Sequence, residues 1–111
     1  FQFIYRNGRS FANRYLVMYL LKNGTGQNRL GISVSKKVGN SVVRHRLTRL
    51  VRESYRKNEY RFERGLDMIV IVRPGAKERS FFEIESALIH IAQKQHALAD
   101  TAGTWLLADK N

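Results

Sequence analysis

The side chains best suited to chemistry in this sequence are cations gathered at the start of a helical pattern. Lys36 and Lys37 precede that pattern, and Arg44 and Arg46 stand in its first turns. Because a helix start carries partial positive charge and favours Asp or Glu, cations at this point oppose the helix dipole. A docked phosphate would be attracted by the free backbone N–H groups, the dipole and the guanidinium groups together. The pattern therefore predicts a polyanion-binding helix start.

Apolar and basic residues separate onto two faces of this helix. At about 100° per residue, one arc holds the core-type set Val43, Leu47, Leu50, Val51, Ser54 and Tyr55. The other side holds the basic set His45, Arg46, Arg49, Arg52 and Arg56. A solvated charged face is the alternative, but a single Glu53 cannot pair with every cation, and the planar arginine fork suits phosphate oxygens. We therefore interpret the basic side as a nucleic-acid-binding face.

Three aromatic residues form a second candidate site. Phe1 and Tyr5 are one helical turn apart and can share a face, and Tyr19 points to the opposite side of its strand from Met18. Aromatic rings on a sheet face stack unpaired bases without reading sequence. Core packing is the alternative, and composition alone favours it for Phe1 and Tyr5.

A protein active site is not expected. The sequence has no Cys, no HExxH pattern, no P-loop and no carboxylate pair at a spacing typical of an active site. Asp67 lacks acidic neighbours, so a two-metal nuclease cluster is poorly supported. His90 and His96 do not share a helical face, and His45 on a basic helix is expected to donate to a phosphate or a base. We predict no catalytic residue and no metal site on the protein.

The elements that would position these side chains follow from apolar periodicity and turn residues. A helix over about 41–60, capped by Asn40 or Ser41, carries the basic face. The other predicted segments are a short helix or arm over 1–8 stopped by Gly8, strands over 15–21, 29–35 and 66–72, a turn or hairpin loop over 23–28, a turn at 74–75, and a helix that begins with a capping box over 80–83.

These elements predict a single-domain α+β fold, a two-layer sandwich of helices on a small mixed sheet in the order αβββαβα. The strands on either side of the basic helix are expected to be parallel neighbours joined by a crossover. The domain would cover 1–97. The tail over 98–111 has no predicted structure, and its Trp105, Leu106 and Leu107 would dock on the domain or a partner.

Composition limits the class of partner. The chain has 111 residues, a formal net charge of +11 and a pI of about 10.6. Clustered charge on this scale favours a nucleic acid over an anionic membrane surface. No apolar run approaches the ~20 residues of a membrane span, and the absence of cysteine is compatible with the cytoplasm, where we expect the protein. Because the sequence starts at Phe1 rather than at a methionine, the question whether a segment precedes it is left open.

The run SVSKKVGNSVVRHRLTRLVRESYR over 33–56 resembles the central motif of the bacterial ribonuclease P protein family. The resemblance extends upstream through FQFIYRNGRSFANRYLVMYLL and downstream through DMIVIVRPGA and SFFEIESAL, to about residue 96. Two departures are visible, because His45 replaces the usual asparagine and Thr48 stands where a basic residue is common. The resemblance implies a fold like a domain of ribosomal proteins, with a left-handed crossover around the basic helix, although the general rule favours a right-handed one.

The resemblance also implies a role. The protein would be the subunit of a ribonucleoprotein that endonucleolytically removes the 5′ leader from precursor tRNA, with catalysis by the RNA subunit and Mg²⁺ held mainly by that RNA. The implied RNA-binding residues are Lys36, Lys37, Asn40, Arg44, His45, Arg46, Arg49 and Arg52, and the implied leader-binding residues are Phe1, Tyr5 and Tyr19. The expected partners are the catalytic RNA and precursor tRNA, with a monomeric protein in a one-to-one complex and no membrane contact. A general RNA-binding or ribosomal-type protein and a self-sufficient nuclease are the alternatives.

Overall fold

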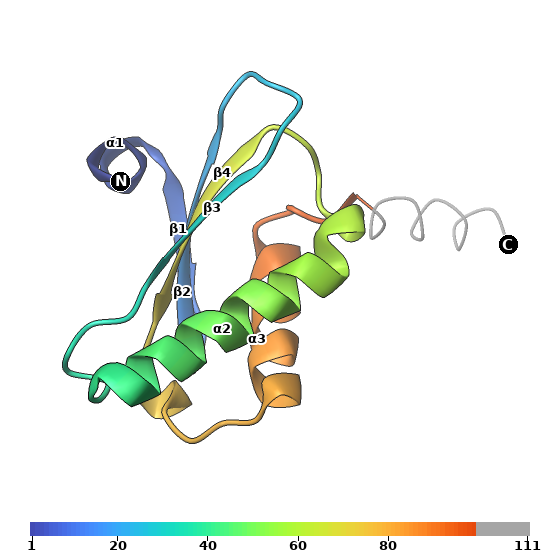
Figure 1. Cartoon of the computed structure of the whole chain (residues 1–111). Helices are drawn as coiled ribbons and strands as arrows, with labels where there is room; N and C mark the ends of the chain where they lie inside the picture. The colour runs from blue at the N-terminus through green and yellow to red at the C-terminus, as the bar shows by residue number, and fades with distance from the viewer. Residues whose placement is uncertain (100–111) are drawn as a thin grey trace, which may run out of the picture.

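The fold is built on a twisted four-stranded sheet, with two long helices on one face and a short helix on the other (Figure 1). The computed structural model describes residues 1–99. Its elements are α1 (Gln2–Asn7), β1 (Arg9–Ala12), β2 (Leu16–Lys22), β3 (Arg29–Ser33), α2 (Ser41–Asn58), β4 (Leu66–Val72) and α3 (Phe81–Lys94), with 3-10 turns at Glu59–Arg61 and Pro74–Ala76. This order is the predicted αβββαβα, and the α+β class is confirmed.

The strand order in the sheet is β1-β2-β4-β3. β3 and β4 pair in parallel, as predicted for the two strands that flank α2, whereas β4 is antiparallel to β2. The 23–28 segment was predicted to be a turn or a hairpin loop. The hairpin alternative is wrong, because β4 lies between β2 and β3 in the sheet. The reason is the burial of β4 on both faces, with Met68 1% exposed and Ile69 fully buried, since a strand that is apolar on both sides belongs in the middle of a sheet.

The true hairpin joins β1 to β2, with Phe11 opposite Met18. The predicted order αβββαβα contained one more strand before α2 than the segments identified there, and it did not locate that strand. The run RSFA of β1 is too short to show the alternation of apolar and polar residues that identifies a strand. β1 forms the edge of the sheet, where four residues exposed to solvent suffice to pair with β2.

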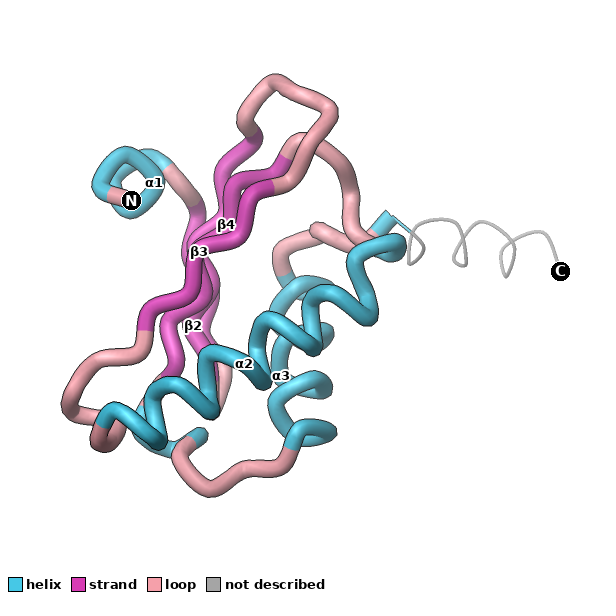
Figure 2. The backbone as a smooth tube through the Cα atoms, in the orientation of Figure 1, coloured by secondary structure: helices cyan, strands magenta, loops and turns pink. Residues whose placement is uncertain are grey.

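The core lies between the sheet and the pair α2 and α3 (Figure 2). Side chains that alternate along the strands meet the apolar stripes of the two helices, as the periods of 2 and 3.6 residues require. The fully buried members include Leu16, Met18, Val70, Leu47, Val51, Ile84 and Leu88. Each such side chain stabilises the fold by about 1.5–3 kcal/mol relative to an exposed position, so the helix layer is held firmly enough to present its outer face.

Local signals fix the starts of the two long helices. Asn40, rather than Ser41, caps α2, and its Oδ1 accepts from the backbone N–H of Val43 at 3.0 Å. The predicted capping box of α3 is present, because Ser80 and Glu83 each bond the other's backbone N–H. The backbone N–H of Ser80, as the largest cause, lowers the pKa of the Glu83 carboxyl. α2 gives way to a 3-10 turn after Asn58, two residues before the predicted end.

The described chain ends against the helix layer. Leu98 is 3% exposed and forms an isolated bridge with Phe62, and the N–H of Glu63 donates to the carbonyl of Ala97. The packed domain thus includes Leu98, one residue past the predicted boundary, while Trp105, Leu106 and Leu107 lie outside the described residues. Within residues 1–99, no helix combines the length and apolar character needed to cross a bilayer. The handedness of the β3–α2–β4 crossover stays a prediction.

Candidate nucleic-acid interface

The outer face of α2 presents a row of cations to solvent. We define this basic face by His45, Arg46, Arg49 and Arg52, all of which are exposed. On the opposite side of the helix, Leu47 and Val51 are fully buried. Among residues 1–99, no acidic side chain forms an ion pair with His45, Arg49 or Arg52. These charges are therefore held apart by the helix and are available to an external polyanion.

Arg56, which the sequence placed on the same side, is not available in this way. Its guanidinium donates to both carboxylate oxygens of Glu53 one turn earlier. That hydrogen bond lowers the pKa of the Glu53 carboxyl and raises the pKa of Arg56. The positive stripe on α2 therefore fades towards the C-terminal end of the helix and is strongest in its first three turns.

Arg46 has a second role that the sequence did not indicate. Its Nη2 donates to the carbonyl of Arg79 at 2.8 Å, and its Nη1 donates to the carbonyl of Lys77 at 3.4 Å. The start of α2 and the loop before α3 thus lie side by side, as Figure 1 also shows. Two further cations, on Lys77 and Arg79, are brought beside the basic face by this contact.

The remaining predicted RNA-binding residues gather at the start of α2. Lys36 and Lys37 are exposed in the loop from β3, immediately before the cap formed by Asn40. Arg44 is half-buried, and its Nε is buried without a hydrogen-bond partner within residues 1–99. A buried donor of this kind needs an acceptor. The helix start therefore brings two exposed lysines and the partly exposed Arg44 side chain together with the first backbone N–H groups of α2.

The three aromatic residues also come together, on the opposite face of the sheet from α2 and α3. The ring of Tyr5 meets that of Tyr19 edge-to-face, with centroids 4.9 Å apart, and Phe1 meets Tyr5 in the same manner at 6.3 Å. Phe1 is 63% exposed and Tyr5 37% exposed. Pure core packing is therefore not the arrangement of Phe1 and Tyr5, whereas Tyr19 is partly buried. We call this group, Phe1, Tyr5 and Tyr19, the aromatic cleft.

Gly31 allows α1 to approach the sheet and was missed from the sequence. A Cβ atom built at this glycine would lie 2.4 Å from Cζ of Phe1, closer than any real contact. Phe1 and Gly31 also line a small cavity of about 220 Å³ between α1 and the sheet. A glycine facing outward on a strand was the available signal, because such a residue often marks the close approach of another group.

One acidic group lies at the end of the same face of the sheet. Asp67 is paired with Arg29, whose Nε donates to its Oδ1 at 2.8 Å, and Asn23 donates to the same oxygen at 2.9 Å. The Arg29 hydrogen bond, with the smaller contribution of Asn23, lowers the pKa of the Asp67 carboxyl. Asp67 is thus a structural partner of Arg29, and its oxygens are already used.

The histidines occupy three different environments. His45 is exposed on the basic face, His90 lies 3.3 Å from the side-chain amide of Asn13, and His96 adopts a left-handed backbone with φ of 57° at the end of α3. Over residues 1–99, no group of three or more His, Cys, Asp or Glu side chains is placed to hold a metal ion.

An arginine-rich helix face on one layer and a cluster of exposed aromatic rings on the other define an RNA-binding α+β protein. The chain belongs to the ribonuclease P protein family, since the family model described as Ribonuclease P matches residues 1–96. Relatives named ribonuclease P protein component support this. The protein of Lachnoclostridium phytofermentans is 60% identical over 90 residues, covering 81% of this chain and 78% of the relative. That of Alkaliphilus metalliredigens is 48% identical over 99 residues, covering 89% of each.

Solved structures agree with the fold. The RNase P protein of Staphylococcus aureus superimposes with a TM-score of 0.81 at 38% identity, covering 87% of this chain and 89% of that one. The Thermotoga maritima RNase P protein gives a TM-score of 0.79 at 32% identity, covering 84% and 88%. The resemblance seen in the sequence is thus confirmed. The protein is the subunit of the ribonucleoprotein that processes precursor tRNA, part of an endoribonuclease holoenzyme, and its partners are the RNA subunit and that substrate.

Proposed function

We propose that the protein divides its two partners between two surfaces. The basic face, together with Lys36, Lys37, Asn40 and Arg44, binds the catalytic RNA, and the aromatic cleft holds the single-stranded leader of precursor tRNA. The observation that carries this proposal is the placement of the unpaired cations Arg49 and Arg52 on the helix layer and of the exposed rings on the other side of the sheet.

The chemistry of each surface suits its proposed occupant. Arginine forks and the free N–H groups of a helix start bind phosphate oxygens whatever the base sequence, and such contacts fix register and orientation. Exposed rings stack unpaired bases without selecting among them, which fits a leader that differs from one precursor tRNA to the next.

Catalysis would then belong to the RNA subunit, with Mg²⁺ held mainly by that RNA. The buried carboxylate that could attract a metal, Asp67, already accepts from Arg29 and Asn23, and so it fits a metal site poorly. The protein supplies binding and orientation of the leader, and neutralises phosphates near the metal-dependent cleavage. We further propose a monomeric protein in a one-to-one complex with the RNA, acting in the cytoplasm.

A cleavage assay with three samples tests the assignment of catalysis to the RNA subunit. Precursor tRNA is incubated with the protein alone, with the catalytic RNA alone and with both, at low Mg²⁺. The proposal expects correct removal of the 5′ leader to rise only in the combined sample. Cleavage by the protein alone would identify the protein as a self-sufficient nuclease. Equal cleavage by the catalytic RNA with and without the protein would identify it as a general RNA-binding protein with no role in cleavage.

A further inference from the structure

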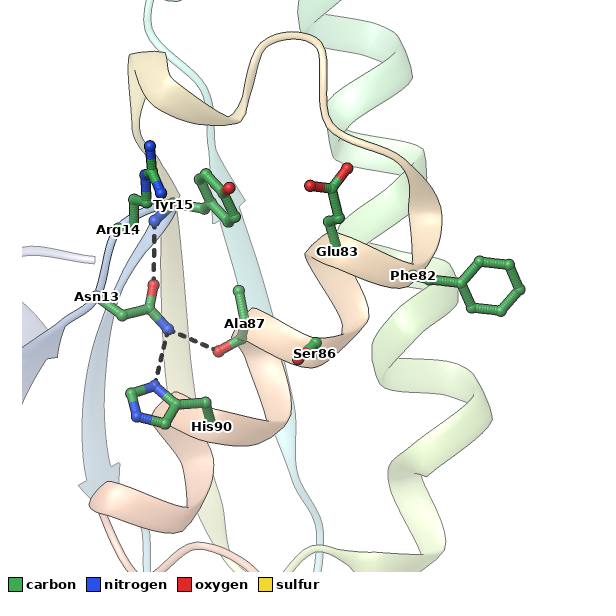
Figure 3. A pocket seen from close by; sticks show the side chains of 8 residues that line it. All are labelled: Asn13, Arg14, Tyr15, Phe82, Glu83, Ser86, Ala87 and His90. Carbon is green, nitrogen blue, oxygen red and sulfur yellow. Dashed lines mark hydrogen bonds between the residues drawn. The ribbon is translucent and has the colours of Figure 1, made fainter.

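A cavity of about 540 Å³ lies at the end of the sheet where β2 begins (Figure 3). The turn between β1 and β2 forms one wall with Arg14 and Tyr15, and the first three turns of α3 form the other with Glu83, Ser86 and His90. None of these residues belongs to the basic face or to the aromatic cleft. Its size falls in the range of about 300–1,000 Å³ that is usual for sites that bind small molecules.

Arg14 lines this end of the cavity, and Arg79 and Arg73 contact two of its lining residues, Tyr15 and Asn13, without lining it themselves. The guanidinium groups of Arg14 and Arg79 lie 5.8 and 5.5 Å from the ring centroid of Tyr15. Arg73 donates to the carbonyl of Asn13 in the same turn, at 2.7 Å. Arg79 is paired with Glu83, but no acidic side chain within residues 1–99 pairs with Arg14 or Arg73. The rim therefore carries positive charge that an anion would neutralise.

The interior offers both donors and acceptors. Oδ1 of Asn13 accepts from the backbone N–H groups of Tyr15 and Leu16, so the orientation of its amide is fixed. Its Nδ2 therefore donates to the carbonyl of Ala87 at 2.8 Å and faces Nδ1 of His90 at 3.3 Å, as the dashed lines in Figure 3 mark. Nδ1 must accept in this arrangement, so the neutral ring carries its proton on Nε2.

His90 Nε2–H is thus a donor that the turn does not use, and the Ser86 hydroxyl can both donate and accept. The Glu83 carboxylate is already engaged, because its Oε1 accepts from the backbone N–H of Ser80 and its Oε2 from Arg79. The Tyr15 ring and the Ala87 methyl group supply apolar walls beside them. A flat heterocycle with donors and acceptors on its edges would satisfy these groups. An apolar peptide or a lipid chain would leave them unpaired, at a cost of about 1–3 kcal/mol for each buried polar group.

We propose that this cavity binds one unpaired nucleotide of an RNA. The base enters between Tyr15 and Ala87, its edge meets Ser86 and His90, and a flanking phosphate meets Arg14. The contact of Arg46 with the carbonyl of Arg79 places this rim next to the basic face. The inference rests on the proposed function, because it needs an RNA already held by α2, and it adds a contact point that neither proposed surface contains.

Chemical probing of RNA nucleotides in the assembled complex tests the proposal. Ser86→Phe fills the cavity from an exposed helix position, and Arg14→Ala removes a cation at its rim. Gln93→Phe is the matched control, because Gln93 is an equally exposed residue of α3, about two turns further on, and does not line this cavity. Reactivities are compared for the catalytic RNA alone, for its complex with each protein, and for each complex with precursor tRNA.

The expected result is one short unpaired segment that the wild-type protein and the Gln93→Phe variant protect and that Ser86→Phe and Arg14→Ala leave reactive. Affinity for the RNA that holds this segment should fall about tenfold, as for the loss of one stacked base. A segment in the catalytic RNA assigns the nucleotide to that RNA, and one that is protected only when precursor tRNA is present assigns it to the substrate.

Identical protection by all four proteins would overturn the nucleotide site. An Arg49→Ala variant separates this failure from failure of the proposed function. If Arg49→Ala weakens RNA binding while Ser86→Phe changes nothing, the basic face stands and the cavity proposal alone is wrong. If Arg49→Ala and Ser86→Phe both leave protection and affinity unchanged, both are wrong.

Discussion

Arg46 on α2 holds the backbone of Arg79, donating to its carbonyl oxygen at 2.8 Å across the space between two elements far apart in the sequence. A residue expected to serve only the RNA thus also fastens the loop before α3. Arg49, one turn further along α2, makes no such contact among residues 1–99. The two arginines look alike in the sequence, and the structure separates their roles.

This difference gives the first prediction. Arg49→Ala should weaken binding to the catalytic RNA, flatten the slope of log K against log salt by about one unit, and leave the free energy of unfolding unchanged. Arg46→Ala should weaken RNA binding as well and also lower the free energy of unfolding by about 1 kcal/mol, because two backbone carbonyls lose their donor. Salt titrations and chemical denaturation measure the two effects.

Arg46→Lys is the control for this pair. Lysine keeps the positive charge but not the fork that reaches two carbonyls. The salt slope should stay near that of the wild type, while the loss of stability persists. Equal stability of Arg46→Ala and the wild type would show that the contact with the loop contributes nothing.

His45 gives a second prediction, since the family resemblance of the central motif implies an asparagine at this position. If the neutral ring hydrogen-bonds the RNA, His45→Asn should keep the affinity at every pH. If the imidazolium binds a phosphate, wild-type affinity should be higher in acidic than in neutral solution, and the asparagine variant should lack this dependence. Binding measured from pH 5.5 to about 8 distinguishes the two. A large loss for His45→Asn across the whole range would contradict both.

Asp67 gives a prediction about stability and pH. The Arg29 hydrogen bond depresses the pKa of the folded carboxyl, so the unfolded state binds a proton more readily. The ion pair is therefore fully stabilising above the unfolded pKa of about 3.9, and this contribution is lost as the pH falls through the lower folded pKa. Asp67→Asn should be less stable than the wild type at pH 7, and the gap should narrow below about pH 4. A constant gap between pH 7 and 2 would exclude this coupling.

The sequence predicted what local rules control. The capping side chains of Asn40 and Ser80 predicted two helix starts. The alternation of Leu30 and Ile32 correctly predicted which side of β3 faces the core. Contacts between elements far apart in the chain could not be predicted from the sequence. The insertion of β4 between β2 and β3 depends on pairing partners that are far apart in the chain. Which of several similar arginines fastens a loop depends on the same tertiary arrangement.

The candidate site shows the same limit. The arginines of α2 and the aromatic residues were found because residue type and helical spacing suffice to group them. Gly31 was not found, because its function is to leave room for Phe1, a residue thirty positions earlier. The cavity between Tyr15 and Ser86 was missed for the same reason, since its two walls come from opposite ends of the chain.

Gly31 yields a fourth prediction. Gly31→Ala places a methyl group where the Phe1 ring lies, so the ring and α1 must shift while the sheet keeps its pairing. Precursor tRNA should bind the holoenzyme more weakly, and mature tRNA, which has no leader, should bind as before. In a Phe1→Ala background the same change should add little, because the clash is absent. Additive losses in the double variant would mean that Gly31 acts independently of Phe1.

The last prediction concerns Tyr19, whose ring meets Tyr5 at a centroid distance of 4.9 Å on the sheet face opposite α2. Stacking on one ring is worth about 1–3 kcal/mol per base, so Tyr19→Ala should weaken binding of precursor tRNA to the holoenzyme about tenfold. Binding of mature tRNA and assembly with the catalytic RNA should hardly change, because the proposed function assigns neither to the aromatic cleft. Tyr19→Phe keeps the ring and should retain most of the affinity. The measurement is the ratio of precursor to mature tRNA affinity, with circular dichroism to verify folding. A folded Tyr19→Ala variant with the wild-type ratio would mean that the ring only packs against Tyr5 and that the leader binds elsewhere.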